Sequence, residues 1–257
     1  MQAGTPEERV RQLFQALLDA FGPQHWWPAR TPLEVIIGSI LVQNTAWANA
    51  EKALHRLRSA RALSLRAMRS LPLFELEQLI RPAGFFRQKS RTIQSFVAFI
   101  DREYAGSLDA MARQHTNVLR LQLLGICGVG PETADSILLY AAQHPVFVVD
   151  AYARRVLFRH GLIAEDASYE DVQKLGSAAL ADYLVAVSHP PTHNLDSHTP
   201  TPMSRKTKSQ AVEAFNEMHG LLVAIGKRFC RKAAPDCNNC PLLALLPLSA
   251  RARVPGI

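Results

Sequence analysis

The 257-residue sequence lacks any long apolar run. Apolar stretches such as Val35–Ile37 and Ile40–Val42 are broken by polar or small residues and fall far short of the ~20 apolar residues that a membrane helix needs. The first eight residues, Met1–Glu8, include acids and have no apolar centre, so they do not resemble a secretory signal. With only 13 glycines and 16 prolines, collagen-like and low-complexity proteins are excluded as well. We therefore expect a cytoplasmic protein that does not enter a membrane.

Cysteine and acidic residues are also scarce. Four cysteines are too few to suggest a disulfide framework, but Cys230, Cys237 and Cys240 crowd into one short stretch, which suggests a metal or cluster site. Acids number 22 against 29 lysines and arginines, giving a net charge of +7. This balance favours a polyanionic partner such as nucleic acid, although many basic proteins bind none.

Strand signals are nearly absent, and helical spacing dominates. Val10, Leu13, Leu17 and Phe21 fall on one face of a helix that should end near Gly22. Thr31 followed by Pro32 predicts a capped start for a second helix. Similar spacing recurs over 48–59, 64–70, 74–80, 88–104, 107–114, 131–142 and 211–229. Pro145–Val149 reads as a short extended piece, so the predicted fold class is all-α.

The segment 186–209 breaks this pattern. Prolines stand among His, Thr and Ser, so it has no periodic apolar face and is predicted to be a mobile insertion. His189, His193 and His198 could suggest a metal site, but we interpret them as solvated loop residues.

Two glycines, Gly128 and Gly130, flank Val129 between predicted helices. Glycines allow a tight turn that brings backbone N–H groups against an anion, and the following helix adds its positive N-terminal dipole. The pattern therefore predicts either a phosphate-binding hairpin or a plain helix–helix turn.

The surrounding residues favour the first interpretation. The hairpin stretch Leu124–Ala134, followed at this distance by Val148–Tyr152, resembles the helix-hairpin-helix DNA glycosylases of the endonuclease III superfamily. Leu41–Thr45 is similar to that family's L-x-Q-x-T helix end, and Gly84–Lys89 is similar to its loop before a basic helix. The resemblance covers roughly 10–246 apart from the insertion, and it also includes the three clustered cysteines near the C-terminal end.

The resemblance implies a two-lobed fold with the active-site cleft between the lobes. A six-helix lobe with the hairpin would comprise 32–145, and a second lobe would combine 1–31 with 146–257, including the insertion and the cysteine loop. It implies base excision repair of double-stranded DNA, with the damaged base flipped into the cleft. We expect a monomer.

Asp150 is the predicted catalytic residue, because it matches the family's essential aspartate. A carboxylate beside C1′ stabilises the positive charge that develops on the sugar and can orient the attacking water. Asp150 is also well suited to cap a helix that starts at Ala151, and the two roles are compatible.

At the position of the nucleophilic lysine of bifunctional family members, this sequence has Glu132. A carboxylate cannot form the Schiff base that drives strand cleavage, so a monofunctional glycosylase is predicted. Two alternatives stay open: an endonuclease III-like glycosylase/lyase for oxidised pyrimidines that uses another amine, and a non-catalytic module that binds damaged DNA.

Tryptophans supply the predicted base pocket. The turn Trp26-Trp27-Pro28 and Trp47 contain all three of the chain, and indole faces attract cations such as methylated purines. Together with the missing lysine they resemble the 3-methyladenine glycosylase branch, which implies that Lys227 and Glu132 line the pocket. Core packing of the tryptophans and a phosphate-facing or solvated Lys227 are the alternatives.

The predicted DNA contacts lie in three motifs. The resemblance implies that Gln43 fills the void left by the flipped base and that Phe85 or Phe86 wedges into the duplex. Lys89, with neighbouring arginines, would neutralise phosphates. The hairpin residues Gly128, Val129, Gly130 and Thr133 complete the set.

The cysteine loop departs from the family pattern. The fourth ligand of a [4Fe–4S] cluster should lie six residues after Cys240, at Leu246, and no later cysteine exists. Cys230, Cys237 and Cys240 could hold a cluster with a foreign ligand, or the loop could be a metal-free remnant. A zinc site would lack a fourth ligand too.

Overall fold

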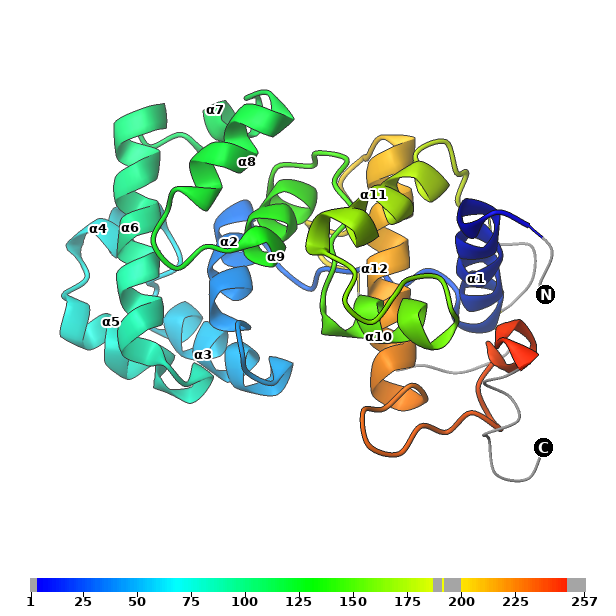
Figure 1. Cartoon of the computed structure of the whole chain (residues 1–257). Coiled ribbons are helices and arrows are strands. Elements are labelled where there is room, and N and C mark those ends of the chain that lie inside the picture. Colours follow the sequence, from blue (N-terminus) through cyan, green and yellow to red (C-terminus); the bar gives the residue numbers. More distant parts are fainter. Residues whose placement is uncertain (1–3, 187–190, 192–199, 249–257) are drawn as a thin grey trace. The chain divides into compact units, whose positions relative to one another are not determined.

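The computed structural model of the chain describes residues 4–186, 191 and 200–248 (Figure 1). Helices make up its regular structure, and these residues contain no strand, which confirms the all-α prediction. No helix in the described ranges is both long and apolar enough to cross a membrane.

The described residues form two compact units. One lies within Met1–Pro28, Pro145–Pro200 and Ser204–Ile257, and the other is made of Ala29–His144 with Thr201–Met203. Their boundaries fall at 28/29 and 144/145, within three residues of the lobe boundaries expected from the sequence. We call them the termini unit and the hairpin unit.

The hairpin unit is built around α2 (Pro32–Leu41), in which every residue from Leu33 to Leu41 is buried. The predicted cap is present, because the Thr31 side chain accepts a hydrogen bond from the Glu34 backbone N–H. Four elements pack against α2, which are α3 (Trp47–Ser59), α6 (Phe86–Tyr104), α9 (Pro131–Ser136) and η2 (Ile137–Ala141). The remaining elements of this unit pack on those four: α4 (Leu65–Ser70), α5 (Leu73–Ile80), η1 (Arg81–Ala83), α7 (Leu108–Ala112) and α8 (Thr116–Leu124).

The termini unit is built around α12 (Gln210–Arg228), which packs against α1 (Pro6–Phe21), α10 (Ala151–Arg159) and α11 (Tyr169–Leu180). A short η3 (Leu243–Leu245) follows the cysteine loop. The predicted stripe on α1 is buried along its length, as its spacing required.

One helix was not assigned from the sequence. α11 starts with a capping box between Ser168 and Asp171 and buries few large side chains. Its Gly176 lies against the Phe147 ring, where a Cβ atom would come within 2.5 Å of a ring carbon. Close packing of a small residue, which hydrophobic spacing does not reveal, holds this helix in place.

The predicted helix 131–142 changes its hydrogen bonding part-way. It is α-helical to Ser136 and continues over Ile137–Ala141 as a wider π turn. After it, residues 145–149 run without regular structure, and Val146, Phe147, Val148 and Val149 are buried. This buried segment delivers the chain to Asp150.

Most of the predicted insertion, 187–190 and 192–199, lies outside the described residues, including His189, His193 and His198. The described part beyond it is packed: Met203 and Ser204 are buried, and the Lys208 ammonium donates a hydrogen bond to the Ser204 carbonyl. The predicted mobility of 186–209 is therefore untested over most of its length.

Candidate active site and DNA-contact residues

Asp150 lies at the junction between the buried segment 145–149 and α10. Its Oδ1 atom accepts a hydrogen bond from the Ala153 backbone N–H at 2.7 Å, so the carboxylate caps the helix as predicted. The residue is only 9% exposed. The cap occupies Oδ1 and leaves Oδ2 to a neighbour on another helix.

That neighbour is His219 of α12, whose Nε2 atom lies 3.3 Å from Asp150 Oδ2. The sequence analysis missed His219, because nothing in the spacing of a single buried histidine on an apolar helix indicates its partner. Tyr152 lies on the same side of α12, against Gly226, where a side chain would overlap the tyrosine ring. Burial, and next the charge of Asp150, raise the pKa of Tyr152.

The tryptophan turn also contacts α12. A Cβ atom at Gly220 would come within 3.1 Å of the Trp26 Cβ, and the Lys227 ammonium lies 5.7 Å from the centre of a Trp26 ring. Gly220 and Lys227 are seven residues apart and share one stripe of the helix, and His219 and Gly226 share the adjacent one. The predicted Lys227–Trp26 neighbourhood is thus present within the termini unit.

Trp26 and Trp27 are buried, with ring centres 5.6 Å apart and ring planes at 52°. Their turn is held by Glu217, a residue that sequence analysis also missed. The Glu217 carboxylate accepts hydrogen bonds from the backbone N–H groups of Gln24 at 2.5 Å and His25 at 3.3 Å. Burial raises the pKa of Glu217, although these two hydrogen bonds act in the opposite direction.

Two of the other pocket candidates lie in the hairpin unit. Trp47, half-buried, is the first residue of α3, and Glu132 is exposed in the first turn of α9. Pro28 is half-buried at the end of the tryptophan turn. The structure brings Trp26, Trp27 and Lys227 together. That these three form one base pocket with Pro28, Trp47 and Glu132 stays a prediction.

The hairpin between α8 and α9 has two glycines with different roles. Gly128 has φ +86°, and a Cβ atom there would overlap the Thr92 side chain, so this position requires glycine. Gly130 has φ −97°, and no heavy atom lies within 4 Å of a Cβ built on it. Behind the turn, the buried Asp135 carboxylate accepts two hydrogen bonds from Arg120, at 2.7 and 3.0 Å.

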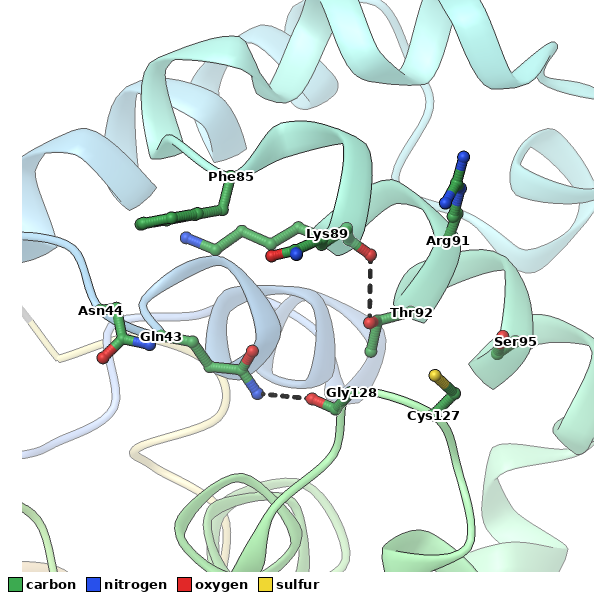
Figure 2. Close-up of a pocket in the computed structure, with 10 residues that line it drawn as sticks. Gln43, Asn44, Phe85, Lys89, Arg91, Thr92, Ser95, Cys127 and Gly128 are labelled. Carbon is green, nitrogen blue, oxygen red and sulfur yellow. Dashed lines mark hydrogen bonds between the residues drawn. The ribbon is translucent and has the colours of Figure 1, made fainter.

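Gln43 is tied to this hairpin, as Figure 2 shows. It follows α2 in a turn in which Asn44 has φ +51°, and its Nε2 atom donates to the Gly128 carbonyl at 3.0 Å and to the Thr133 hydroxyl at 2.7 Å. Thr133 is buried, and its hydroxyl oxygen accepts the hydrogen bond from Gln43.

Beside Gln43 lies a cavity of about 400 Å³. In Figure 2 its walls come from the end of α2, the start of α6 and the hairpin, and the Phe85 ring lies across one side. The residues that line it include Asn44, Gln88, Arg91 and the exposed Cys127.

The two phenylalanines differ in exposure. Phe85 is 62% exposed and has φ +45°, a left-handed conformation that is unfavourable for a large side chain. Phe86 is half-buried, with its ring centre 5.7 Å from the Arg81 guanidinium and 5.9 Å from that of Arg87. Phe85 is thus the more exposed of the two rings, and the role of either as a wedge stays a prediction.

The prediction that Lys89 neutralises phosphate is wrong for the described structure. Lys89 is buried, and its Nζ atom donates hydrogen bonds to the backbone carbonyls of Leu41 and Ala83, each at 2.8 Å. Desolvation lowers the pKa of Lys89 to about 8. The side chain instead links the end of α2, two residues before Gln43, to the end of η1, two residues before Phe85. Arg87 and Arg91, in contrast, are exposed.

The cysteine loop offers a poor set of metal ligands. Cys230, Cys237 and Cys240 line one small, mostly apolar pocket, in which Leu246 also lies. Arg159 donates from Nη1 to the Cys230 sulfur at 3.3 Å and to the Arg231 carbonyl at 2.8 Å. Across the described ranges, no three His, Cys, Asp or Glu side chains are grouped to hold a metal ion. Three thiols of the described residues thus line one pocket, and Leu246 stands where the family pattern has the fourth ligand.

Comparison with known proteins identifies the family. Residues 37–181 match the model of the HhH-GPD superfamily of base excision DNA repair proteins. The chain belongs to this superfamily. A protein of Methanocaldococcus jannaschii that carries the provisional name of a DNA repair glycosylase is 37% identical over 237 residues, 91% of this chain and 94% of its own length. The chain is thus a DNA glycosylase of the HhH-GPD superfamily.

Two solved structures share the fold of this HhH-GPD protein. The 3-methyladenine DNA glycosylase of H. pylori, bound to 1,N6-ethenoadenine, has a TM-score of 0.65 at 24% identity and covers 88% of this chain and 98% of its own. A trapped endonuclease III–DNA covalent intermediate has a TM-score of 0.71 at 24% identity, with 98% and 99% covered. At such identities these similarities establish the fold alone.

Lys89 gives the first testable prediction. Because its pKa in the folded protein, about 8, lies below the value of 10.5 for an unperturbed lysine, the unfolded chain binds more protons between these pH values. Stability should therefore rise from pH 8 to 10.5 by roughly 2–3 kcal/mol in wild type relative to Lys89→Met. Urea unfolding of both proteins across this range measures the difference. A difference that is independent of pH would contradict the prediction.

Proposed function

We propose that this HhH-GPD protein is a monofunctional glycosylase that hydrolyses alkylated purines, such as 3-methyladenine, from duplex DNA. The observation that carries the proposal is the arrangement of Asp150. Its carboxylate is buried at the start of α10, with one oxygen held by the helix N-terminus and the other beside His219. Such a fixed, desolvated negative charge is suited to stabilising a sugar cation.

In the proposed reaction the bond between C1′ and the base nitrogen breaks, and its electron pair leaves with the base. A methylated purine is formally cationic, so it departs as a neutral molecule. The positive charge remains on the sugar beside Asp150. Water then adds to C1′ and releases its proton to the solvent, which leaves an abasic site. No strong general acid is required.

Water is proposed as the nucleophile because of Glu132. The residue lies exposed in the first turn of α9, at the position that carries a lysine in bifunctional family members. Its carboxylate cannot form a Schiff base with the sugar. Its proposed role is electrostatic, since a negative charge favours the start of a helix.

DNA is the proposed partner. The net charge of +7 and the exposed side chains of Arg87 and Arg91 favour a polyanion. Gly130 has neither the positive φ nor the close neighbour that would require glycine, and the free space beside its backbone suits a phosphate. The endonuclease III neighbour, whose structure is described as a DNA complex, supports the same assignment.

An alkylated purine is proposed because of the tryptophan turn. Lys227 already lies over Trp26, so this indole accepts a cation on its face. A cationic base could make the same contact, for about 0.5–2 kcal/mol. The glycosylase from H. pylori, whose title names 3-methyladenine and an ethenoadenine ligand, supports a modified purine.

We further propose that the cysteine loop holds no iron–sulfur cluster. Leu246 occupies the place of the fourth ligand, and Arg159 already bonds the Cys230 sulfur and the adjacent backbone. The hydrogen bonds from Arg159 therefore hold the loop in place without a cluster.

The central prediction concerns base release. Wild-type protein incubated with duplexes that carry methylated or oxidised bases should liberate a methylated purine, identified by mass. Asp150→Asn should lower the single-turnover rate at least ~100-fold, since it removes the charge that stabilises the transition state, while DNA affinity is kept. Asp182→Asn, on an exposed residue outside the site, is the matched control.

Two results would contradict this proposal. A covalent DNA adduct trapped by borohydride, together with release of oxidised pyrimidines, would indicate an endonuclease III-like enzyme with another amine nucleophile. DNA binding without release of any base from the panel would indicate a non-catalytic module.

The two hairpin glycines give a paired prediction. Gly130→Ala should fold with near wild-type stability but bind DNA several-fold more weakly, because the methyl group intrudes where a phosphate would lie. Gly128→Ala should destabilise the protein by about 1–2 kcal/mol or more, because of its positive φ and Thr92. Thermal unfolding and DNA titration separate the two effects. Unchanged DNA affinity in Gly130→Ala would argue against a phosphate at the hairpin.

Iron analysis tests the cysteine loop. Protein purified without oxygen should contain no stoichiometric iron and lack the broad visible absorbance of a cluster. Leu246→Cys, which restores a fourth thiol, should gain that absorbance after reconstitution with iron and sulfide. Stoichiometric iron in the wild-type protein would overturn the proposal.

A further inference from the structure

His219 is a buried histidine that faces a buried carboxylate. Its side chain is 6% exposed, that of Asp150 is 12% exposed, and 3.3 Å separates Nε2 from Oδ2. With Oδ1 held at 2.7 Å by the Ala153 N–H, the carboxylate is contacted at both oxygens by groups from two different helices. The carboxylate therefore has a neighbouring group at each of its two oxygens.

The burial of Asp150 gives the contact with His219 an energetic role. Asp150 is largely buried at the start of α10, a helix that packs against α12. A carboxylate in such surroundings is costly unless polar groups meet it. The nearby Arg155 guanidinium is directed elsewhere, with Nε donating to the Cys230 carbonyl at 2.6 Å and Nη2 to that of Gly226 at 3.0 Å.

The type of partner matters for the chemistry. A lysine or arginine against Oδ2 would cancel the negative charge that the sugar cation needs. A neutral imidazole donates one N–H and orients the carboxylate without removing its charge. A distance of 3.3 Å is long for such a bond, and catalytic hydrogen bonds are often long before the substrate is bound.

We propose that His219 is a positioning residue that holds the Asp150 carboxylate, through Nε2–H and Oδ2, in the orientation that stabilises the sugar cation. This inference rests on the proposed function, since it concerns how the same carboxylate acts. It adds a residue from α12 that no sequence motif indicated.

The experiment compares two abasic duplexes that differ in charge. One contains a pyrrolidine, which is cationic at the position of C1′, and the other a neutral tetrahydrofuran. The ratio of their dissociation constants reports how well Asp150 meets a positive charge. Wild type should prefer the cationic duplex. In His219→Leu the ratio of the two dissociation constants should fall about tenfold, while binding of the tetrahydrofuran duplex stays unchanged. His219→Gln, which keeps an N–H donor, should retain most of the wild-type ratio.

A double-mutant cycle shows whether His219 acts through Asp150. Asp150→Asn should remove the preference, and adding His219→Leu should then have no further effect. Asn216→Leu, which removes another buried polar side chain from α12, is the matched control and should keep the preference. Thermal unfolding of each variant accounts for losses of stability, and His219→Gln provides the test if His219→Leu does not fold.

The outcomes separate the two proposals. Three results would overturn the role of His219 alone. The preference for the cationic duplex could survive in His219→Leu, the mutation could weaken binding of both duplexes equally, or it could still change the preference in the Asp150→Asn background. A preference that depends on His219 without release of any base supports this role and contradicts the proposed hydrolysis. No preference in the wild type overturns both.

Discussion

The termini unit depends on one constraint, which is that the buried Asp150 carboxylate needs polar neighbours where little water reaches it. Asp150 meets this constraint through the first turn of α10 and through His219. The consequence reaches beyond the residue itself. α10 must begin at that residue, α12 must pass beside it, and the buried segment 145–149 must end at it. These three elements thus form a single support for one functional group.

Close backbone approach is the second theme. In the termini unit, Gly220 and Gly226 let the tryptophan turn and Tyr152 pack against adjacent stripes of α12. In the hairpin unit, Gly128 lets the turn approach Thr92 of α6. Each glycine admits a neighbour that any side chain would displace. Gly130 is different, because the space beside it is open, and it is there that we propose a phosphate.

Interactions across long sequence separations explain where prediction from the sequence failed. The Gly84–Lys89 motif, with Arg91 just after it, indicated a basic patch, and the exposure of Arg87 and Arg91 agrees with this. Lys89 belongs to the same motif, yet α6 turns it inward, where two backbone carbonyl oxygens accept hydrogen bonds from its ammonium group. Helix α11 was not assigned, since its Gly176 packs on Phe147, a residue 29 positions earlier. His219 and Glu217 escaped notice for the same reason.

Local patterns in the sequence were enough to determine the all-α class, most helices, the hairpin turn and the cap at Asp150, whereas the meaning of Glu132 came from the family resemblance. These features depend on residues within a few positions of one another, where spacing, capping and backbone preference act directly. The tertiary structure alone decided that Phe85 is exposed while Lys89 is buried, and that α12 brings His219 to Asp150 and Lys227 to Trp26. Those facts depend on which faces of distant helices meet, and no local pattern specifies that.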